Sequence, residues 1–262
     1  MNFSIELAPN WKRGLTLNHP VMIVTPSWDS SPVGAIVTPP LTARLRARAA
    51  DPRVIDLPGG FLLNSRAANP GVSQFVEQHQ RAWEKSVTPI IVALAAQAAD
   101  DWAKLAARLE RAPGVSGIEL HLNPVVDAVS AIQQTRAATD LPILTKLDLE
   151  NARAIARACL DAGANALVIS RAPRGARVIE GKIRRGRMYG PFVQPMVLNA
   201  LNEIAALKLG APLIACGGIH SVEDVRAFLS AGADAVEIDT AQWVDAASVA
   251  RLCEEIAGAR DD

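Results

Sequence analysis

The chain has 262 residues, half of them apolar, and its 27 basic residues balance 27 acidic ones. This length suits one large α/β domain over 1–262, and a chain without net charge offers no broad basic field for nucleic acid or anionic lipid. No apolar run is long enough to span a bilayer, and three cysteines without C-x-x-C spacing indicate neither a zinc site nor a disulfide framework. We therefore expect a cytoplasmic protein without a metal site, whose partner is a small-molecule substrate.

The first 39 residues predict a hairpin followed by two buried strands. Residues 1–19 alternate (FSIELAP), turn at 10–14 and return as LTLN, as a β-hairpin does. Apolar runs at 20–26 and 35–39 are typical of buried strands. Only 27–34 lie between them, fewer than the dozen or so residues that a parallel crossover needs. The first βα unit is therefore expected to be abbreviated.

The rest of the chain alternates between short apolar runs and segments with helical spacing. Expected strands cover 89–95, 117–122, 142–147, 166–170, 212–215 and 235–238, and expected helices cover 73–85, 100–111, 126–138, 150–161, 193–207, 222–231 and 246–257. Strand–helix alternation implies a parallel sheet covered by helices, and eight strand candidates after the hairpin favour a closed (β/α)8 TIM barrel. Two segments break the pattern: a polar stretch at 41–71, expected to be irregular, and a basic, glycine-rich insertion loop at 171–191.

The most specific local pattern lies at 211–244. One apolar run ends at Gly217 and Gly218, and the next apolar run ends shortly before Thr240 and Ala241. Glycines let a backbone approach an anion without a Cβ in the way, and the loops after the last two strands of a barrel commonly hold phosphate. This favours an anion site over a plain strand-to-helix turn.

Charged residues inside the expected strands are candidates for chemistry. Glu119 and His121 alternate along one strand, so both point the same way, and Lys146 ends the next strand. The three could converge inside the barrel, with His121 as an acid/base near neutral pH. The alternative is a hydrogen-bonded core triad with a Lys146–Glu119 ion pair. The basic insertion either covers an anionic ligand or is solvated.

Several blocks along nearly the whole chain point to one family. They are LTLNHPVMIVT, GAIVTPPLT, LLNSRAANPGV, TPIIVALAA, GIELHLNP, LPILTKLD, YGPFVQPMVLNALNEIA and ACGGIHSVEDVRAFLSAGADAVEIDTA. These blocks resemble the dihydroorotate dehydrogenases, FMN-dependent (β/α)8 enzymes of pyrimidine biosynthesis. The resemblance implies an FMN-dependent oxidoreductase acting on the CH–CH bond of dihydroorotate or a related small ring compound. It also implies a homodimer, because that barrel family is often dimeric.

The resemblance assigns roles to individual residues. The FMN phosphate would be held by Gly190, Gly217, Gly218, Thr240 and Ala241. Lys146 would lie beside the flavin ring, where a cation stabilises negative charge on the reduced flavin. Ser170 aligns with the family's asparagine after the sixth strand, and Asn64 and Ser65 would face the substrate.

This sequence also departs from the family pattern. The stretch 120–124, which should carry the catalytic cysteine or serine, has no thiol or hydroxyl, so His121 and Glu119 are the candidate bases. Pro39 stands where a lysine is usual, and Asp239 comes close to the expected phosphate. Two alternatives therefore stay open without flavin. One is a barrel that only binds a phosphorylated or carboxylated metabolite, and the other is a lyase or isomerase for a phosphorylated sugar or indole, with Lys146 or Glu119 as its acid/base.

Overall fold

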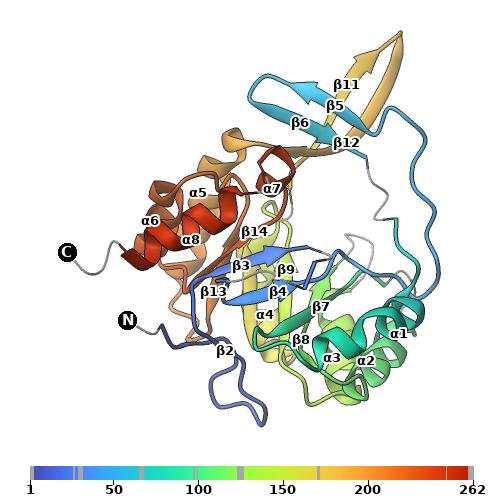
Figure 1. The fold of residues 1–262 in the computed structure, drawn as a ribbon, viewed down its shortest axis with the longest axis vertical. Coiled ribbons are helices and arrows are strands. Elements are labelled where there is room, and N and C mark those ends of the chain that lie inside the picture. The colour runs from blue at the N-terminus through green and yellow to red at the C-terminus, as the bar shows by residue number, and fades with distance from the viewer. Residues whose placement is uncertain are drawn as a thin grey trace.

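The computed structural model describes residues 3–25, 27–28, 32–64, 68–96, 98, 100–122, 127–169, 172–245 and 247–258. Figure 1 shows a barrel of strands with helices around it and a smaller sheet standing beyond one end. Among the described residues, no helix is both long enough and apolar enough to cross a membrane.

The centre of the fold is a closed barrel, which within the described ranges has eight strands in the order β10-β13-β14-β3-β4-β7-β8-β9. Neighbouring strands are all parallel. They are β3 (Val21–Val24), β4 (Ala35–Val37), β7 (Ile90–Leu94), β8 (Val115–His121), β9 (Ile143–Leu147), β10 (Ala166–Ile169), β13 (Leu213–Cys216) and β14 (Ala235–Ile238). Their positions are almost all buried, which explains the continuous apolar runs. The predicted (β/α)8 barrel is confirmed.

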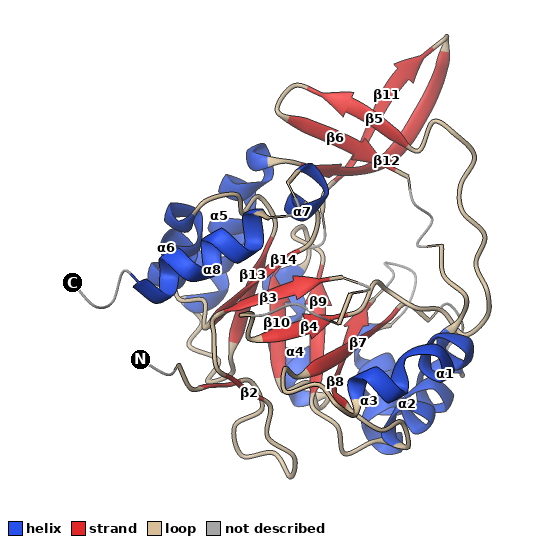
Figure 2. Ribbon diagram, viewed as in Figure 1, coloured by secondary structure: helices blue, strands red, loops and turns tan. Residues whose placement is uncertain are grey.

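Helices cover the outside of this barrel (Figure 2). They are α1 (Val72–Trp83), α2 (Asp101–Glu110), α3 (Ala128–Ala138), α4 (Ala152–Asp161), the 3-10 turn η1 (Pro191–Val193), α5 (Gln194–Ala205), α6 (Val222–Ser230), α7 (Ala241–Val244) and α8 (Ser248–Gly258). Helix α6 starts with a capping box, in which Ser221 accepts from the Asp224 backbone N–H at 3.2 Å. Helix faces and outer strand faces share one apolar core, which includes Trp83 and Trp102.

The first βα unit is abbreviated, as predicted: the described residues between β3 and β4, which are 25, 27–28 and 32–34, contain no helix. Trp28 packs edge-on against Trp83 of α1, with ring centroids 5.3 Å apart. Its indole Nε1 also donates to His79 Nδ1 at 3.0 Å. The short connection is therefore anchored on the helix of the following unit.

The predicted N-terminal hairpin is present as β1 (Ile5–Glu6) paired with β2 (Thr16–Leu17). Its buried residues, which share one apolar cluster with the inward side chains of the barrel, are Leu7, Ala8, Leu15 and Leu17. Trp11 fixes the hairpin to the barrel, because its Nε1 donates to Asp140 O at 2.7 Å and the Arg136 guanidinium lies 3.9 Å from the centroid of its ring. The hairpin closes the end of the barrel opposite the small sheet.

The expectation of an irregular stretch at 41–71 and of a loop at 171–191 was wrong where strands form, over 54–63 and 174–189. These segments contribute the strands of a small antiparallel sheet in the order β11-β12-β6-β5. They are β5 (Val54–Leu57), β6 (Gly60–Leu63), β11 (Arg174–Ile179) and β12 (Lys182–Tyr189). The β11–β12 turn is Glu180-Gly181, with φ of 50° and 71°, as a two-residue type I′ turn requires. The strands escaped prediction because much of this sheet is exposed, so its residues lack an apolar period.

Candidate active site

A pocket of about 740 Å³ lies between the carboxyl ends of the barrel strands and the small sheet. This volume is typical of small-molecule sites, which span about 300–1,000 Å³. The predicted site residues that line it are Asn64, His121, Lys146, Gly190, Gly217, Gly218, Thr240 and Ala241. Glu119 lies behind this lining and is fully buried, and Ser65 and Ser170 fall outside the described residues. The structure therefore gathers the described candidates at one end of the barrel.

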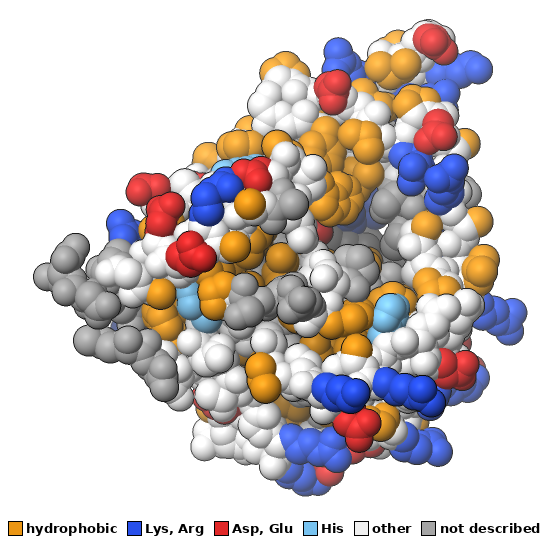
Figure 3. All heavy atoms as spheres, viewed as in Figure 1, with side chains coloured by type: hydrophobic (Ala, Val, Ile, Leu, Met, Phe, Trp, Pro, Cys, Tyr) orange, Lys and Arg blue, Asp and Glu red, His pale blue; other side chains and the backbone are white. Residues whose placement is uncertain are grey.

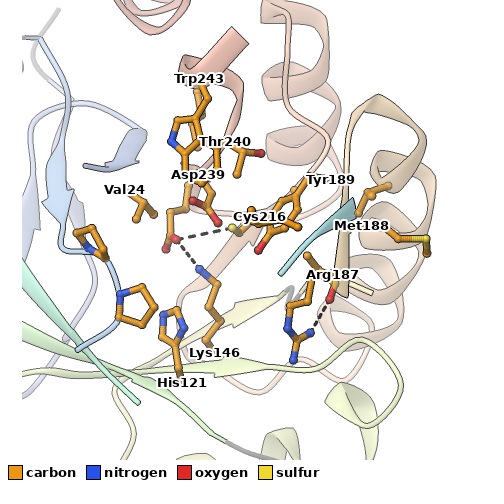
Figure 4. A pocket seen from close by; sticks show the side chains of 18 of the residues that line it. Val24, His121, Lys146, Arg187, Met188, Tyr189, Cys216, Asp239, Thr240 and Trp243 are labelled. Carbon is orange, nitrogen blue, oxygen red and sulfur yellow. Dashed lines mark hydrogen bonds and ion pairs between the residues drawn. The ribbon is translucent and has the colours of Figure 1, made fainter. Parts of the chain in front are cut away.

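The floor of the pocket is a charged cluster, which we define as Glu119, His121, Lys146, Cys216 and Glu237. Figure 4 labels His121, Lys146 and Cys216 of this cluster. Lys146 Nζ lies 2.5 Å from Glu237 Oε1 and 3.4 Å from Glu119 Oε1. Both glutamates have no exposed surface, and Lys146 is 5% exposed. Lys146 is on β9 and Glu237 on β14, so this ion pair crosses the barrel interior. The expected Lys146–Glu119 contact is present, but Glu237 is the nearer partner.

Burial and mutual charge set the protonation of this cluster. Burial alone would lower the pKa of Lys146, but the surrounding carboxylates raise it well above its ordinary value. Burial, followed by the charge of Glu119, raises the pKa of Glu237 to about 7. Burial also raises the pKa of the Cys216 thiol, which is therefore neutral at neutral pH. Lys146 stays a cation, while Glu237 is poised to exchange a proton.

His121 joins the cluster to the pocket. Its Nε2 lies 2.5 Å from Glu119 Oε1, and its side chain is 15% exposed whereas that of Glu119 is not exposed at all. A carboxylate behind an imidazole fixes the orientation of the ring and stabilises its protonated form. The pair therefore has the arrangement of an oriented acid/base that faces the pocket.

The opposite side of the pocket is built from backbone. Gly217 and Gly218 turn the chain after β13, with φ of 123° and 73°. A Cβ on Gly218 would lie 2.3 Å from the backbone nitrogen of Gln194, at the start of α5. Thr240 and Ala241 begin α7 directly after β14. The first N–H groups of a helix have no intrahelical acceptor, so strand-end turns and helix starts that meet here can bind an anion.

Four arginines line the pocket on the side of the small sheet, and we name Arg46, Arg53, Arg174 and Arg187 the arginine wall. Arg174 and Arg187 are directly opposite each other in the β11–β12 register. Asp148 lies 3.6 Å from Arg187 and offsets part of this charge. Like charges facing each other across two strands are destabilising, so an anion between them would stabilise the arrangement. Lys and Arg side chains stand along this sheet in Figure 3.

An aromatic stack ties the small sheet to the barrel. The ring of Phe61 on β6 stacks on Tyr189 of β12 and on Trp243 of α7, with centroids 5.5 Å and 6.3 Å away. Tyr189 and Trp243 both line the pocket (Figure 4). Burial raises the pKa of Tyr189, so its hydroxyl remains a hydrogen-bond donor.

Sequence analysis missed several of these residues, Glu237, Arg46 and Arg53 among them. Glu237 did leave a signal, because it is the only charged residue in the buried run 235–238, and a buried charge needs a partner or a function. No sequence pattern pointed to Arg46 and Arg53, because their position over the barrel depends on the path of the long segment that contains β5 and β6. Within the described residues, no group of His, Cys, Asp and Glu is arranged to hold a metal ion.

Fold and site together define a (β/α)8 barrel whose pocket combines a glycine turn after one strand with a buried lysine at the end of another. The chain belongs to the dihydroorotate dehydrogenase family, which it matches over residues 24–259. The family resemblance seen in the sequence is thereby confirmed, and the two alternatives without flavin are not favoured.

Individual relatives agree with this assignment. The chain is 31% identical over 276 residues to the dihydroorotate dehydrogenase B (NAD(+)) catalytic subunit of Desulforudis audaxviator, covering 93% of this chain and 89% of that protein. It is 29% identical over 285 residues to the same subunit of Geotalea uraniireducens, covering 97% and 91%. A crystal structure of DHODH from Eimeria tenella in complex with ferulenol shares the fold, with a TM-score of 0.77 at 18% identity, covering 95% of this chain and 82% of that one.

Proposed function

We propose that this protein is an FMN-dependent oxidoreductase that oxidises dihydroorotate or a closely related small ring acid. The observation that carries the proposal is the division of one pocket into an anion-binding backbone turn and a charged floor with Lys146, in a chain of this family. The turn suits the phosphate of a flavin nucleotide and Lys146 suits its ring.

The described residues fit FMN. The phosphate would be held by Gly190, Gly217, Gly218, Thr240 and Ala241, at the turn where a Cβ on Gly218 would meet backbone. Lys146 would keep a positive charge beside the ring. Asp239 lies next to the proposed phosphate site, and burial raises its pKa to about 6, so uptake of one proton removes the repulsion. FMN, when bound, supplies the hydride acceptor of the reaction. Ser170 remains a proposed cofactor contact.

In this proposal His121 is the base. Its imidazole takes the proton from an activated C–H of the substrate, and the Glu119 carboxylate 2.5 Å away stabilises the imidazolium that results. Cys216 is a poor base, because its thiol is buried with a raised pKa and lies 3.6 Å from Glu237. The family's usual thiol or hydroxyl is thus replaced by a histidine–carboxylate pair.

The arginine wall and Asn64 would hold the substrate. Arg174 and Arg187 offer planar guanidinium groups to the substrate carboxylate, and the Asn64 amide can pair with an imide edge. Ser65 remains a proposed substrate contact. Since the relatives above are catalytic subunits of NAD(+)-linked enzymes, we also propose NAD(+) as the final electron acceptor and a further subunit, or a second copy of this chain, as a partner.

A rapid-mixing experiment tests the role of His121. Protein loaded with FMN is mixed anaerobically with dihydroorotate, and loss of flavin absorption is followed. We expect His121→Asn to slow this loss by about 10²–10⁴-fold, the usual contribution of a general base, while FMN affinity is unchanged. His79→Asn, on α1 and away from the pocket, should leave the rate unchanged. An equal rate in His121→Asn and wild type would refute the assignment.

A further inference from the structure

The two buried glutamates of the charged cluster share a single cation. Lys146 Nζ contacts Oε1 of Glu237 at 2.5 Å and Oε1 of Glu119 at 3.4 Å. The second oxygen of each carboxyl, Oε2, is buried without a hydrogen-bond donor among the described residues. Two buried acceptors that lack a donor cost free energy, and a proton on one carboxyl would supply the missing donor.

Among the residues that the structure describes, Lys146 is the one cation in ion-pair contact with Glu237. The titratable groups that interact with Glu237 are Lys146 from β9, Glu119 from β8, the Cys216 thiol from β13 and Asp239 two residues further along the chain. His121 of β8 contacts Glu119, and Tyr189 of β12 lines the same pocket. With both glutamates ionised and His121 in the neutral form that a base requires, one ammonium would balance two carboxylates that have no exposed surface, and the floor would carry excess negative charge. Like carboxylates at such a site cannot both ionise easily.

We propose that Glu119 and Glu237 hold one shared proton at neutral pH and that Glu237 is thereby the residue that sets the charge of the pocket floor. The pKa of Glu237, raised to about 7 by burial and then by Glu119, agrees with this assignment. A proton held between two interacting carboxyls belongs to the pair and not to either residue alone.

The effect of the shared proton on ligand binding rests on the proposed function. With the shared proton the floor is neutral: Lys146 balances one carboxylate and the other is a carboxylic acid. Loss of the proton makes the floor negative, close to where an anionic ligand would lie. Binding of that ligand is then coupled to retention of one proton, so its affinity should fall up to tenfold per pH unit above about pH 7. Glu237 acts through charge and through Lys146, so it is a positioning residue.

Infrared spectroscopy of the protein without flavin tests the shared proton directly. The carbonyl band of a protonated carboxylic acid is separate from carboxylate bands and can be followed from pH 5 to pH 9. We expect a band that fades with a midpoint near pH 7 in the wild type and that is missing from Glu237→Gln. Asp239→Asn should keep it, losing only a component with a midpoint near pH 6. Absence of the band in wild type at pH 6, or its persistence in Glu237→Gln, overturns the proposal.

A binding experiment tests the consequence separately. FMN affinity is measured by fluorescence titration from pH 6 to pH 9 in wild type, Glu237→Gln and the surface control Glu150→Gln. We expect wild type and control to weaken above pH 7, whereas Glu237→Gln, which is permanently neutral, should show a flatter profile. Parallel profiles in all three overturn the coupling. Failure of every protein to bind FMN would refute the proposed function, while the infrared result would still decide the shared proton.

Discussion

Replacement of Lys146 by methionine tests the charged cluster through stability. Met nearly matches the length of the lysine stem but removes the ammonium from two carboxyls that have no exposed surface. Removing one partner of a buried ion pair costs about 3–5 kcal/mol, because the remaining charge is left uncompensated. We therefore expect Lys146→Met to lose about 3–5 kcal/mol of unfolding free energy at pH 8. Without the ammonium, the folded state binds protons at the pair more tightly than the unfolded state, so the variant's stability falls as pH rises. The loss should be smaller at pH 5.5.

Urea denaturation followed by tryptophan fluorescence at pH 5.5 and pH 8 measures this difference. The matched control is Lys12→Met, because Lys12 forms an exposed ion pair with Asp140 at 3.0 Å, with side chains 70% and 48% exposed. Exposed pairs contribute about 0–1 kcal/mol, so the control should change little at either pH. A Lys146→Met variant that loses less than about 1 kcal/mol at pH 8, or the same amount at both pH values, would refute the reasoning.

Three further predictions concern the turn, the short first unit and the hairpin. Gly218→Ala forces a Cβ to within 2.3 Å of the Gln194 nitrogen at a φ of 73°, so we expect the free energy of unfolding to fall by about 1–3 kcal/mol. We also expect much weaker FMN binding in a fluorescence titration, and normal binding would contradict the assigned turn. Trp28→Ala removes a partly buried indole that packs on α1, so we expect the free energy of unfolding measured by urea denaturation to fall by roughly 3 kcal/mol. An unchanged denaturation midpoint would show that Trp28 does not anchor the short connection. Trp11→Ala removes the hydrogen bond to Asp140 O and the cation–π contact with Arg136, so we expect the free energy of unfolding to fall by about 1–2 kcal/mol. Hydrogen exchange in the hairpin should become faster, and unchanged exchange would argue against the anchoring role.

The barrel was predictable because its strands are buried on both faces. Runs such as Ile90–Leu94 are apolar throughout, and the segments between the runs have helical spacing. The small sheet was not predictable from the same signal. Strand β11 is largely exposed and rich in arginine, and the pairing of β12 with β6 joins segments more than a hundred residues apart. The Glu180-Gly181 turn was the one local cue to this hairpin.

The site, too, was predictable only in part. The positions of Gly217, Gly218 and Lys146 at strand ends follow from strand boundaries alone, and the shared direction of Glu119 and His121 follows from alternation. The Lys146–Glu237 contact does not follow from sequence, because it crosses the interior between strands that are not neighbours. Closure of the barrel, which no local pattern describes, brings the two side chains together.

The visible absorption spectrum of the purified protein tests the central claim most directly. The protein is incubated with FMN and desalted, its spectrum is recorded, and dihydroorotate is then added without oxygen. The account predicts that the flavin bands are retained after desalting and bleach when dihydroorotate is added. A protein that emerges colourless after incubation with FMN would contradict the account, because the pocket would then not hold the cofactor on which the proposed reaction depends.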